Sequence, residues 1–128
     1  MEIGKTYTIT RTVSKEMQAS YLGSGRVNVY ATAMMIALME ETAVACVQDE
    51  LPERDTTVGT LVNVTHVAAT PVGMNVTATA TLTAIDGRKL SFHIKAEDEC
   101  GLIGEGEHER ALIHTDRFHE KTQAKLKK

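Results

Sequence analysis

The sequence predicts an α+β domain in which an antiparallel sheet of about five strands wraps around one long central helix. Two observations indicate this fold. The run VYATAMMIALMEETAVACV, within residues 29–49, is rich in Ala, Met and Leu and apolar on nearly every side, so it requires cover on most sides. The segments after it alternate apolar and polar residues, which is typical of strands with one buried face.

The part before and within the helix has three elements. Residues 3–12 are threonine-rich and alternate enough for a first strand. Residues 13–28 have no clear period and carry Gly and Ser, so we expect a loop or lid with little core of its own. The central helix then occupies residues 29–49, and Pro52 ends it.

Four strand candidates follow the helix, and an Asp86-Gly87 pair between two of them predicts a type I′ hairpin turn. The clearest candidate, MNVTATATLTAI, places apolar residues on one face and threonines on the other. A basic helical tail is expected over residues 117–128. The four candidates are residues 58–69, residues 74–85, the strand lined by Leu90, Phe92, Ile94 and Ala96, and residues 103–115.

Length and composition exclude several classes of protein. A chain of 128 residues with 42% hydrophobic and 24% charged residues suits a single globular domain, 1–128. A net charge of −3 argues against nucleic-acid binding. The start MEIGKTYTIT has no signal-peptide pattern, and the longest apolar run is shorter than the roughly 20 residues that cross a membrane. Cys46 and Cys100 suggest reduced thiols, so we expect a cytoplasmic protein without membrane contact.

Two glutamates interrupt the apolar helix. Thr32 and Glu40 lie on one ridge at a spacing of eight residues, whereas Glu41 lies about half a turn away. One carboxylate therefore shares a face with the threonine. The alternative is that Glu40 is a surface residue that makes ordinary ion pairs.

A histidine stands in the strand candidate GTLVNVTHVAAT. Strand alternation places His66 on an apolar face with Val62 and Val64, while Asn63 and Thr65 point the other way. A buried imidazole there is either a core or interface residue or part of a site that titrates near neutral pH.

Arg110 and Gly59 each have two interpretations. Arg110 is either paired with nearby glutamates or used to bind an anion. Gly59 is either a turn residue or a place where a ligand approaches the backbone. His108 and His114 share strand parity but are too far apart to bind one metal ion, about 20 Å at 3.3 Å per residue, and no metal site is expected.

Several stretches together resemble the fluoroacetyl-CoA thioesterase family, which has the hotdog fold. The resemblance covers roughly residues 28–120. The specific combination is GTxxxVTHxAATPxG with GxHERAxIH. The stretches are VYATAMMIALMEE, GTLVNVTHVAATPVGMNVTATATL, DGRKLSFHIKAED and GEGEHERALIHTDRF.

The resemblance implies a homodimer that hydrolyses small acyl-CoA thioesters at sites on the subunit interface, and it leaves open whether two dimers pair into a tetramer. It implies that Thr32, Glu40 and His66 are catalytic and that Gly59 and Arg110 contact the substrate. No cofactor is implied, since CoA is part of the substrate. A gating phenylalanine of the fluoroacetyl-specific member would fall near Arg26, and the segment YLGSGRVNVYAT has none. The catalytic class is therefore implied, but not fluoroacetyl-CoA itself.

For the reaction, we expect Glu40 to attack the thioester or to activate water, with Thr32 and His66 assisting. The backbone N–H near Gly59 is the expected oxyanion donor. Three alternatives stay open: a non-catalytic acyl-CoA-binding module, another hotdog enzyme such as a hydratase, and a purely structural dimer. The basic tail suggests either attraction of CoA phosphates or a solvated helix face.

Overall fold

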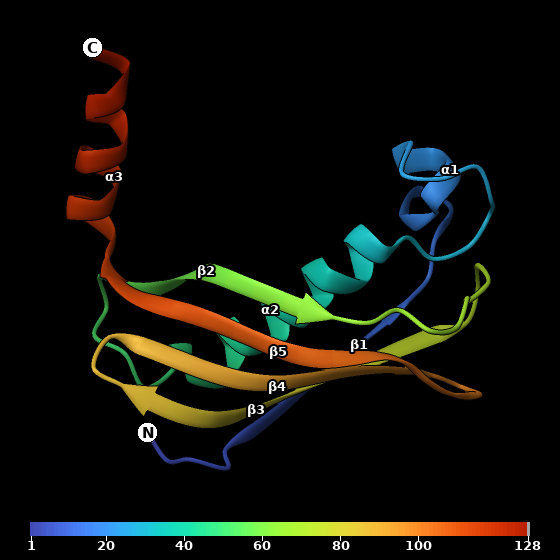
Figure 1. Cartoon of the computed structure of the whole chain (residues 1–128), viewed down its shortest axis with the longest axis horizontal. Helices are drawn as coiled ribbons and strands as arrows, with labels where there is room; N and C mark the ends of the chain where they lie inside the picture. Colours follow the sequence, from blue (N-terminus) through green and yellow to red (C-terminus); the bar gives the residue numbers. More distant parts are fainter. Residues whose placement is uncertain (128) are drawn as a thin grey trace.

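The computed structural model describes residues 1–127, which form one antiparallel five-stranded sheet with the order β1-β3-β4-β5-β2. Helix α2 lies across one face of the curved sheet, and α1 and α3 stand at opposite ends (Figure 1). The fold class predicted from the sequence is thus present. The elements are β1 Thr6–Thr12, η1 Lys15–Met17, α1 Ala19–Leu22, α2 Thr32–Gln48, β2 Asp55–Val64, β3 Asn75–Asp86, β4 Lys89–Asp98, β5 Gly101–His114, α3 Thr115–Gln123 and η2 Ala124–Lys127.

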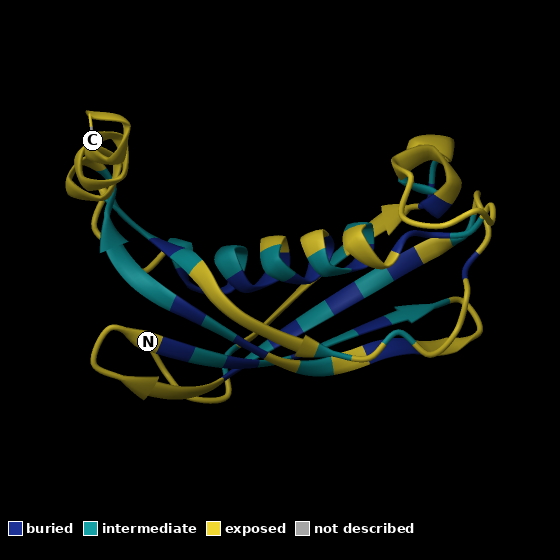
Figure 2. Cartoon of the chain, turned by 45° about the horizontal axis from the view of Figure 1, so that its top comes forward, coloured by how far each residue is buried: buried dark blue, intermediate teal, exposed yellow. Residues whose placement is uncertain are grey.

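Helix α2 is covered on one side only. Its sheet-facing residues are buried and its opposite side is open, as the alternation of dark blue and yellow along the helix in Figure 2 shows. The expectation that one chain covers this helix on most sides is therefore wrong. The buried residues are Met35, Leu38, Met39, Thr42, Ala43, Cys46 and Val47.

Strands β3 and β4 supply the floor under α2. Leu90, Phe92, Ile94 and Ala96 are all buried, as their alternation predicts. On β3 the alternation holds from Val76 to Leu82. Beyond Leu82 the pairing register shifts, and residues 83–86 are exposed on both faces of the strand.

Several predicted boundaries and one turn type differ from the structure. The helix begins at Thr32, not at residue 29, and the candidate 58–69 is a strand over Asp55–Val64 that ends before His66. The hairpin turn after Asp86 is not type I′. Gly87 and Arg88 form its loop and only Gly87 has a positive φ, whereas type I′ requires a positive φ at both positions.

The segment 13–28 contains the short helices η1 and α1 and is attached at both ends. Val13 is buried, and the Ala19 N–H donates to the Val29 carbonyl at 2.9 Å. The Tyr30 N–H donates to Thr70 O at 2.8 Å, which fixes the chain just before α2. Most other side chains of the segment are exposed.

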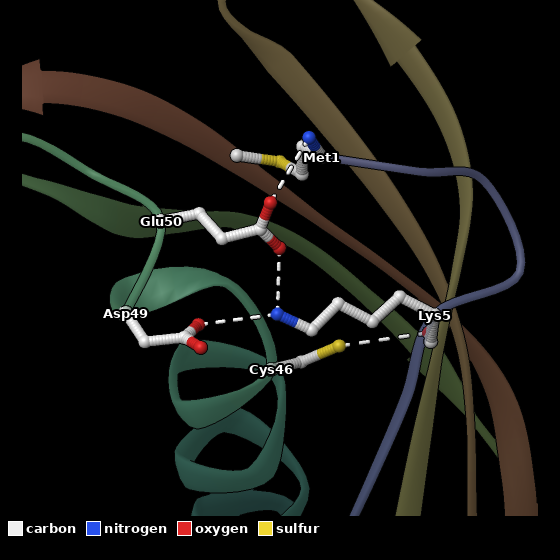
Figure 3. A network of polar contacts seen from close by, with 5 residues as sticks. All are labelled: Met1, Lys5, Cys46, Asp49 and Glu50. Atoms are coloured by element: carbon white, nitrogen blue, oxygen red, sulfur yellow. Dashed lines mark hydrogen bonds and ion pairs between the residues drawn. The ribbon is translucent and has the colours of Figure 1, made fainter.

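A polar network joins the N-terminal segment to the end of α2 (Figure 3). The Lys5 ammonium group lies 2.6 Å from Glu50 and 3.1 Å from Asp49, and the N-terminal amine lies 3.0 Å from Glu50. Two carboxylates at a helix C-terminus repel the negative end of the helix dipole, and Lys5 offsets that repulsion. The ion pair raises the pKa of Lys5 and lowers the pKa of Glu50.

The β2 edge of the sheet is open in a single chain. β2 pairs with β5 alone, so its outer edge is free, and Leu61 and Val62 on it are 43% and 38% exposed. At the end of β5 the chain continues into α3, which stands away from the sheet. Within residues 1–127, no helix combines the length and apolar character that crossing a membrane requires.

Candidate active site

The N-terminus of α2 meets the segment that follows β2 through one hydrogen bond. Thr32 Oγ1 lies 2.7 Å from His66 Nδ1, so the imidazole faces the start of the helix although His66 itself lies beyond the end of β2. His66 Nε2 is buried and has no hydrogen-bond partner in the described part of the chain. Burial lowers the pKa of His66, which keeps the ring neutral at neutral pH. The Thr32–His66 pair therefore holds an uncharged base with one free nitrogen.

A groove of about 370 Å³ runs beside this pair. Its walls come from the lid segment on one side and from residues 66–69 on the other. Its size suits a small ligand. The lining residues are Ala19, Ser24, Gly25, Val27, Val29, Tyr30, Thr32, His66, Val67, Ala68 and Ala69.

A second group of polar side chains lies further along α2, where the helix passes over β2 and β5. Arg110 Nη1 is 3.7 Å from Glu40 Oε2. Gly59 lies directly beneath this pair, because β2 places it opposite Arg110 in the strand register. A Cβ atom on Gly59 would lie 2.8 Å from Glu40 Oε2 and 3.3 Å from Arg110 Nη1. Glycine is therefore required here for close approach of the carboxylate to the backbone.

The Arg110 guanidinium is almost fully buried and is held from two sides. Its Nε donates to Thr57 Oγ1 at 2.7 Å, and its Nη2 donates to the Thr57 carbonyl at 3.0 Å. Its Nη1 donates to His108 Nε2 at 3.1 Å. These bonds fix the guanidinium plane and leave Nη1 facing Glu40. We refer to Glu40, Thr57, Gly59, His108 and Arg110 as the Glu40 cluster.

His108 is fully buried, and its neighbours define its protonation. Its Nδ1 lies 2.8 Å from the Leu61 carbonyl, which only accepts, so Nδ1 carries the proton. Its Nε2 faces Arg110, which only donates, so Nε2 accepts. Burial is the largest effect and lowers the pKa of His108, and the Arg110 charge adds to it; the hydrogen bond to the Leu61 carbonyl, which is second in size, and the Glu40 charge oppose this shift. The imidazole is neutral and acts as a fixed acceptor for Arg110.

The structure brings the predicted residues together in two places rather than one. Thr32 and His66 form one pair, and Glu40, Gly59 and Arg110 form the other group. Thr32 and Glu40 are eight residues apart on α2, about 12 Å along the axis. Among residues 1–127 no hydrogen bond or ion pair joins the two groups.

The two neighbouring glutamates of α2 do have different surroundings, as helix geometry predicted. Glu40 points toward β2 and Arg110, whereas the Glu41 carboxylate is exposed and binds Arg11 of β1 at 2.6 Å. Glu41 is thus an ordinary surface ion pair. The catalytic roles of Thr32, Glu40 and His66 stay predictions.

Sequence reasoning missed His108 and Thr57. The sequence places His108 on the same strand parity as Arg110, two residues away, but His108 was given no role beside the arginine. That spacing is a usable signal for contact between the two side chains. Thr57 has no comparable signal, because its contact depends on the register between β2 and β5.

Comparisons of the sequence and of the structure with known proteins both find fluoroacetyl-CoA thioesterases. The chain is 43% identical over 97 residues to the fluoroacetyl-CoA thioesterase of Streptantibioticus cattleyicolor, which covers 76% of this chain and 70% of that protein. A solved structure of a fluoroacetyl-CoA thioesterase, a threonine-to-alanine variant in complex with fluoroacetate, superposes with a TM-score of 0.92 at 35% identity, over 98% of both chains.

More distant structures share the fold. A thioesterase superfamily member from Thermus thermophilus has a TM-score of 0.89 at 27% identity, over 98% of this chain and 93% of that one. A hot-dog-like protein from Thermanaerovibrio acidaminovorans has a TM-score of 0.89 at 24% identity, over the same shares of the two chains, which shows the hotdog fold. The sequence profile of the family "Fluoroacetyl-CoA-specific thioesterase" matches residues 13–116. The chain therefore belongs to the fluoroacetyl-CoA-specific thioesterase family, and it is a hotdog-fold thioester hydrolase.

Proposed function

We propose that this thioesterase hydrolyses a small acyl-CoA thioester, with Glu40 as the reacting carboxylate and the Thr32–His66 pair of a second subunit completing the site. The observation that carries the proposal is the arrangement of Glu40 against Gly59 and the fixed Arg110. The reaction consumes water and releases an acid and CoA, so it needs no cofactor. Fluoroacetyl-CoA, for which the relatives are named, is one small acyl-CoA among those to test.

Each group has a chemical task in this proposal. The Glu40 carboxylate attacks the thioester carbonyl or takes a proton from water. Arg110 Nη1 and the backbone at Gly59 offer N–H groups to the acyl oxygen, whose negative charge grows in the transition state. His66, neutral because of its burial, accepts or passes a proton, and Thr32 fixes the ring through Nδ1.

A homodimer is proposed because one protomer keeps the two groups apart. The free edge of β2 carries the exposed apolar residues Leu61 and Val62, and pairing with a second β2 would cover them. Antiparallel pairing of two β2 strands about an axis near these residues would bring the segment after the second β2, which carries His66 of the partner subunit, toward the Glu40 cluster. The open side of α2 then faces its copy. A tetramer would require a further interface.

We also propose a cytoplasmic location. Cys46 and Cys100 are both free thiols, Cys100 being exposed, which suits a reducing compartment.

Glu40→Gln and His66→Ala should each lower turnover by at least about a hundredfold, because each removes a group that moves protons or attacks carbon. Thiol release from a panel of short acyl-CoAs measures this effect. Glu41→Gln is the matched control and should change turnover little, since Glu41 faces solvent and Arg11. Near-normal rates for either variant would refute the assignment. A protein that binds acyl-CoA but releases no thiol would be the non-catalytic alternative.

Glu40→Gln and His66→Ala subunits should complement each other in a heterodimer. If Glu40 works with His66 of the partner subunit, a purified heterodimer of the two variants has one intact site and about half of the wild-type rate. Differently tagged, co-expressed subunits allow this measurement. A heterodimer as inactive as both parent homodimers would place the two residues in the same chain's site. A wild-type protein that sediments as a monomer would contradict the dimer itself.

Gly59→Ala should lower turnover by at least about tenfold while the protein stays folded. The added Cβ meets the end of the flexible Glu40 side chain, which moves away at low cost in stability.

Gly106→Ala is the contrasting variant, because its Cβ would meet the Asn63 backbone between β2 and β5. We expect that variant to lose about 1–3 kcal/mol of unfolding free energy. Urea unfolding with thiol-release assays checks both, and a Gly59→Ala enzyme of normal rate would contradict the close approach.

His108→Gln should flatten the dependence of stability on pH. The folded state lowers the pKa of His108, so the unfolded state binds more protons as the pH falls, and stability present above about pH 6.5 is lost below it. The difference in slope between wild type and variant reaches at most about 1.4 kcal/mol per pH unit. Unfolding free energies from pH 8 to pH 5 measure it. His119→Gln, on exposed α3, should follow the wild type, and parallel curves for His108→Gln would exclude a neutral buried ring.

A further inference from the structure

A second, larger groove lies at the end of the molecule where α3 leaves the sheet. It has a volume of about 630 Å³, within the range of small-molecule sites. We call it the α3 groove. Neither the Thr32–His66 pair nor the Glu40 cluster contributes to it. Its lining residues are Arg88, Ile113, His114, Arg117, Phe118, Lys121, Thr122 and Lys125.

The α3 groove is strongly cationic on a chain whose net charge is −3. Four of its eight lining residues are Arg or Lys, and none is Asp or Glu. Within residues 1–127, none of these four cations lies within 4.0 Å of a carboxylate, whereas the nearby Arg54 is paired with Asp116. The Arg88 guanidinium is anchored by donating to the Leu112 carbonyl at 3.1–3.2 Å. A groove lined by cationic side chains that have no carboxylate partner attracts a polyanion.

The groove also has an apolar wall and an unsatisfied polar atom. Ile113 and Phe118 face it beside the cations, and Phe118 is 37% exposed, so its ring is available for stacking. His114 Nδ1 is buried without a hydrogen-bond partner in the described chain. An aromatic base joined to phosphates matches this combination of a flat apolar surface, cations and a free ring nitrogen.

The position of the groove relative to the Glu40 cluster fits one extended ligand. Ile113 and His114 follow Arg110 on β5 by three and four residues, about 10–13 Å along the strand. The pantetheine arm between the CoA sulfur and its first phosphate has roughly as many bonds as four peptide residues, about 14 Å when extended. This length is sufficient for one CoA thioester to reach from Glu40 to the α3 groove.

We propose that the α3 groove binds the nucleotide end of the CoA thioester, with Arg88, Arg117, Lys121 and Lys125 on its phosphates and Phe118 against its adenine ring. This inference rests on the proposed function, because it assigns the other end of the same substrate.

The test compares Arg117→Glu/Lys121→Glu with Lys15→Glu/Lys95→Glu. The second double variant changes net charge equally, and both of its residues lie outside the groove and outside the basic tail. Calorimetry with adenosine 3′,5′-bisphosphate measures the groove alone. Michaelis kinetics with acetyl-CoA and with acetylpantetheine, which lacks the nucleotide, measure its contribution to catalysis.

We expect the groove variant to weaken bisphosphate binding and to raise the KM for acetyl-CoA by about tenfold or more, with kcat/KM for acetylpantetheine unchanged. The control variant should match the wild type in all three measurements. Absence of bisphosphate binding to the wild type, or equal affinity in all three proteins, would overturn the proposal. Failure of the proposed function gives a different result, because the wild type would then release thiol from neither substrate. The calorimetric measurement would still decide whether the α3 groove binds the nucleotide.

Discussion

The buried guanidinium of Arg110 is the constraint on which the rest of the candidate site depends. A charge removed from water is costly unless hydrogen bonds and an opposite charge replace its hydration. Thr57 supplies two acceptors, His108 supplies a neutral nitrogen, and Glu40 supplies the counter-charge. Because these three partners come from β2, β5 and α2, the need to satisfy one guanidinium fixes the helix against the strand pair. Gly59 is a consequence, since any larger residue would displace Glu40.

The one-sided cover of α2 connects the fold to the proposed reaction. The sheet buries Met35, Met39 and Ala43, and the opposite side of the helix stays open in a single chain. That open side runs between the Thr32–His66 pair and the Glu40 cluster, so the proposed catalytic groups of one protomer are separated along the surface that a partner would cover. In the proposed dimer, assembly and catalysis would depend on the same surface. Dissociation would expose the apolar residues of that surface and would also separate the two halves of the site.

The sequence predicted what depends on local periodicity and left out what depends on register. Alternation identified the buried faces of β3 and β4, and helical geometry separated Glu40 from Glu41, whose carboxylates indeed have different partners. Strand ends are poorly marked in such patterns, so the exposure of β3 beyond Leu82 and the end of β2 before His66 were not predicted. The pairing of Thr57 with Arg110 was also out of reach, because it joins residues 53 positions apart. Conversely, the apolar composition of α2 predicted that the helix is covered on most sides, whereas a single chain buries only the side that faces the sheet.

The two ends of the proposed substrate would be recognised by different kinds of interaction, fixed hydrogen bonds at the acyl end and long-range charge attraction at the nucleotide end. At the acyl end, a few polar groups act, and hydrogen bonds to Thr57 and His108 fix the Arg110 guanidinium before the ligand arrives, so geometry controls rate. At the nucleotide end, exposed lysines and arginines on α3 act through a charge field that salt screens, so they control affinity more than rate. A small acyl group offers little area for binding, and most of the binding free energy must then come from the CoA part. A basic groove placed about one pantetheine length from Glu40 is therefore what such an enzyme needs, because binding there holds an otherwise weakly bound acyl group at the carboxylate.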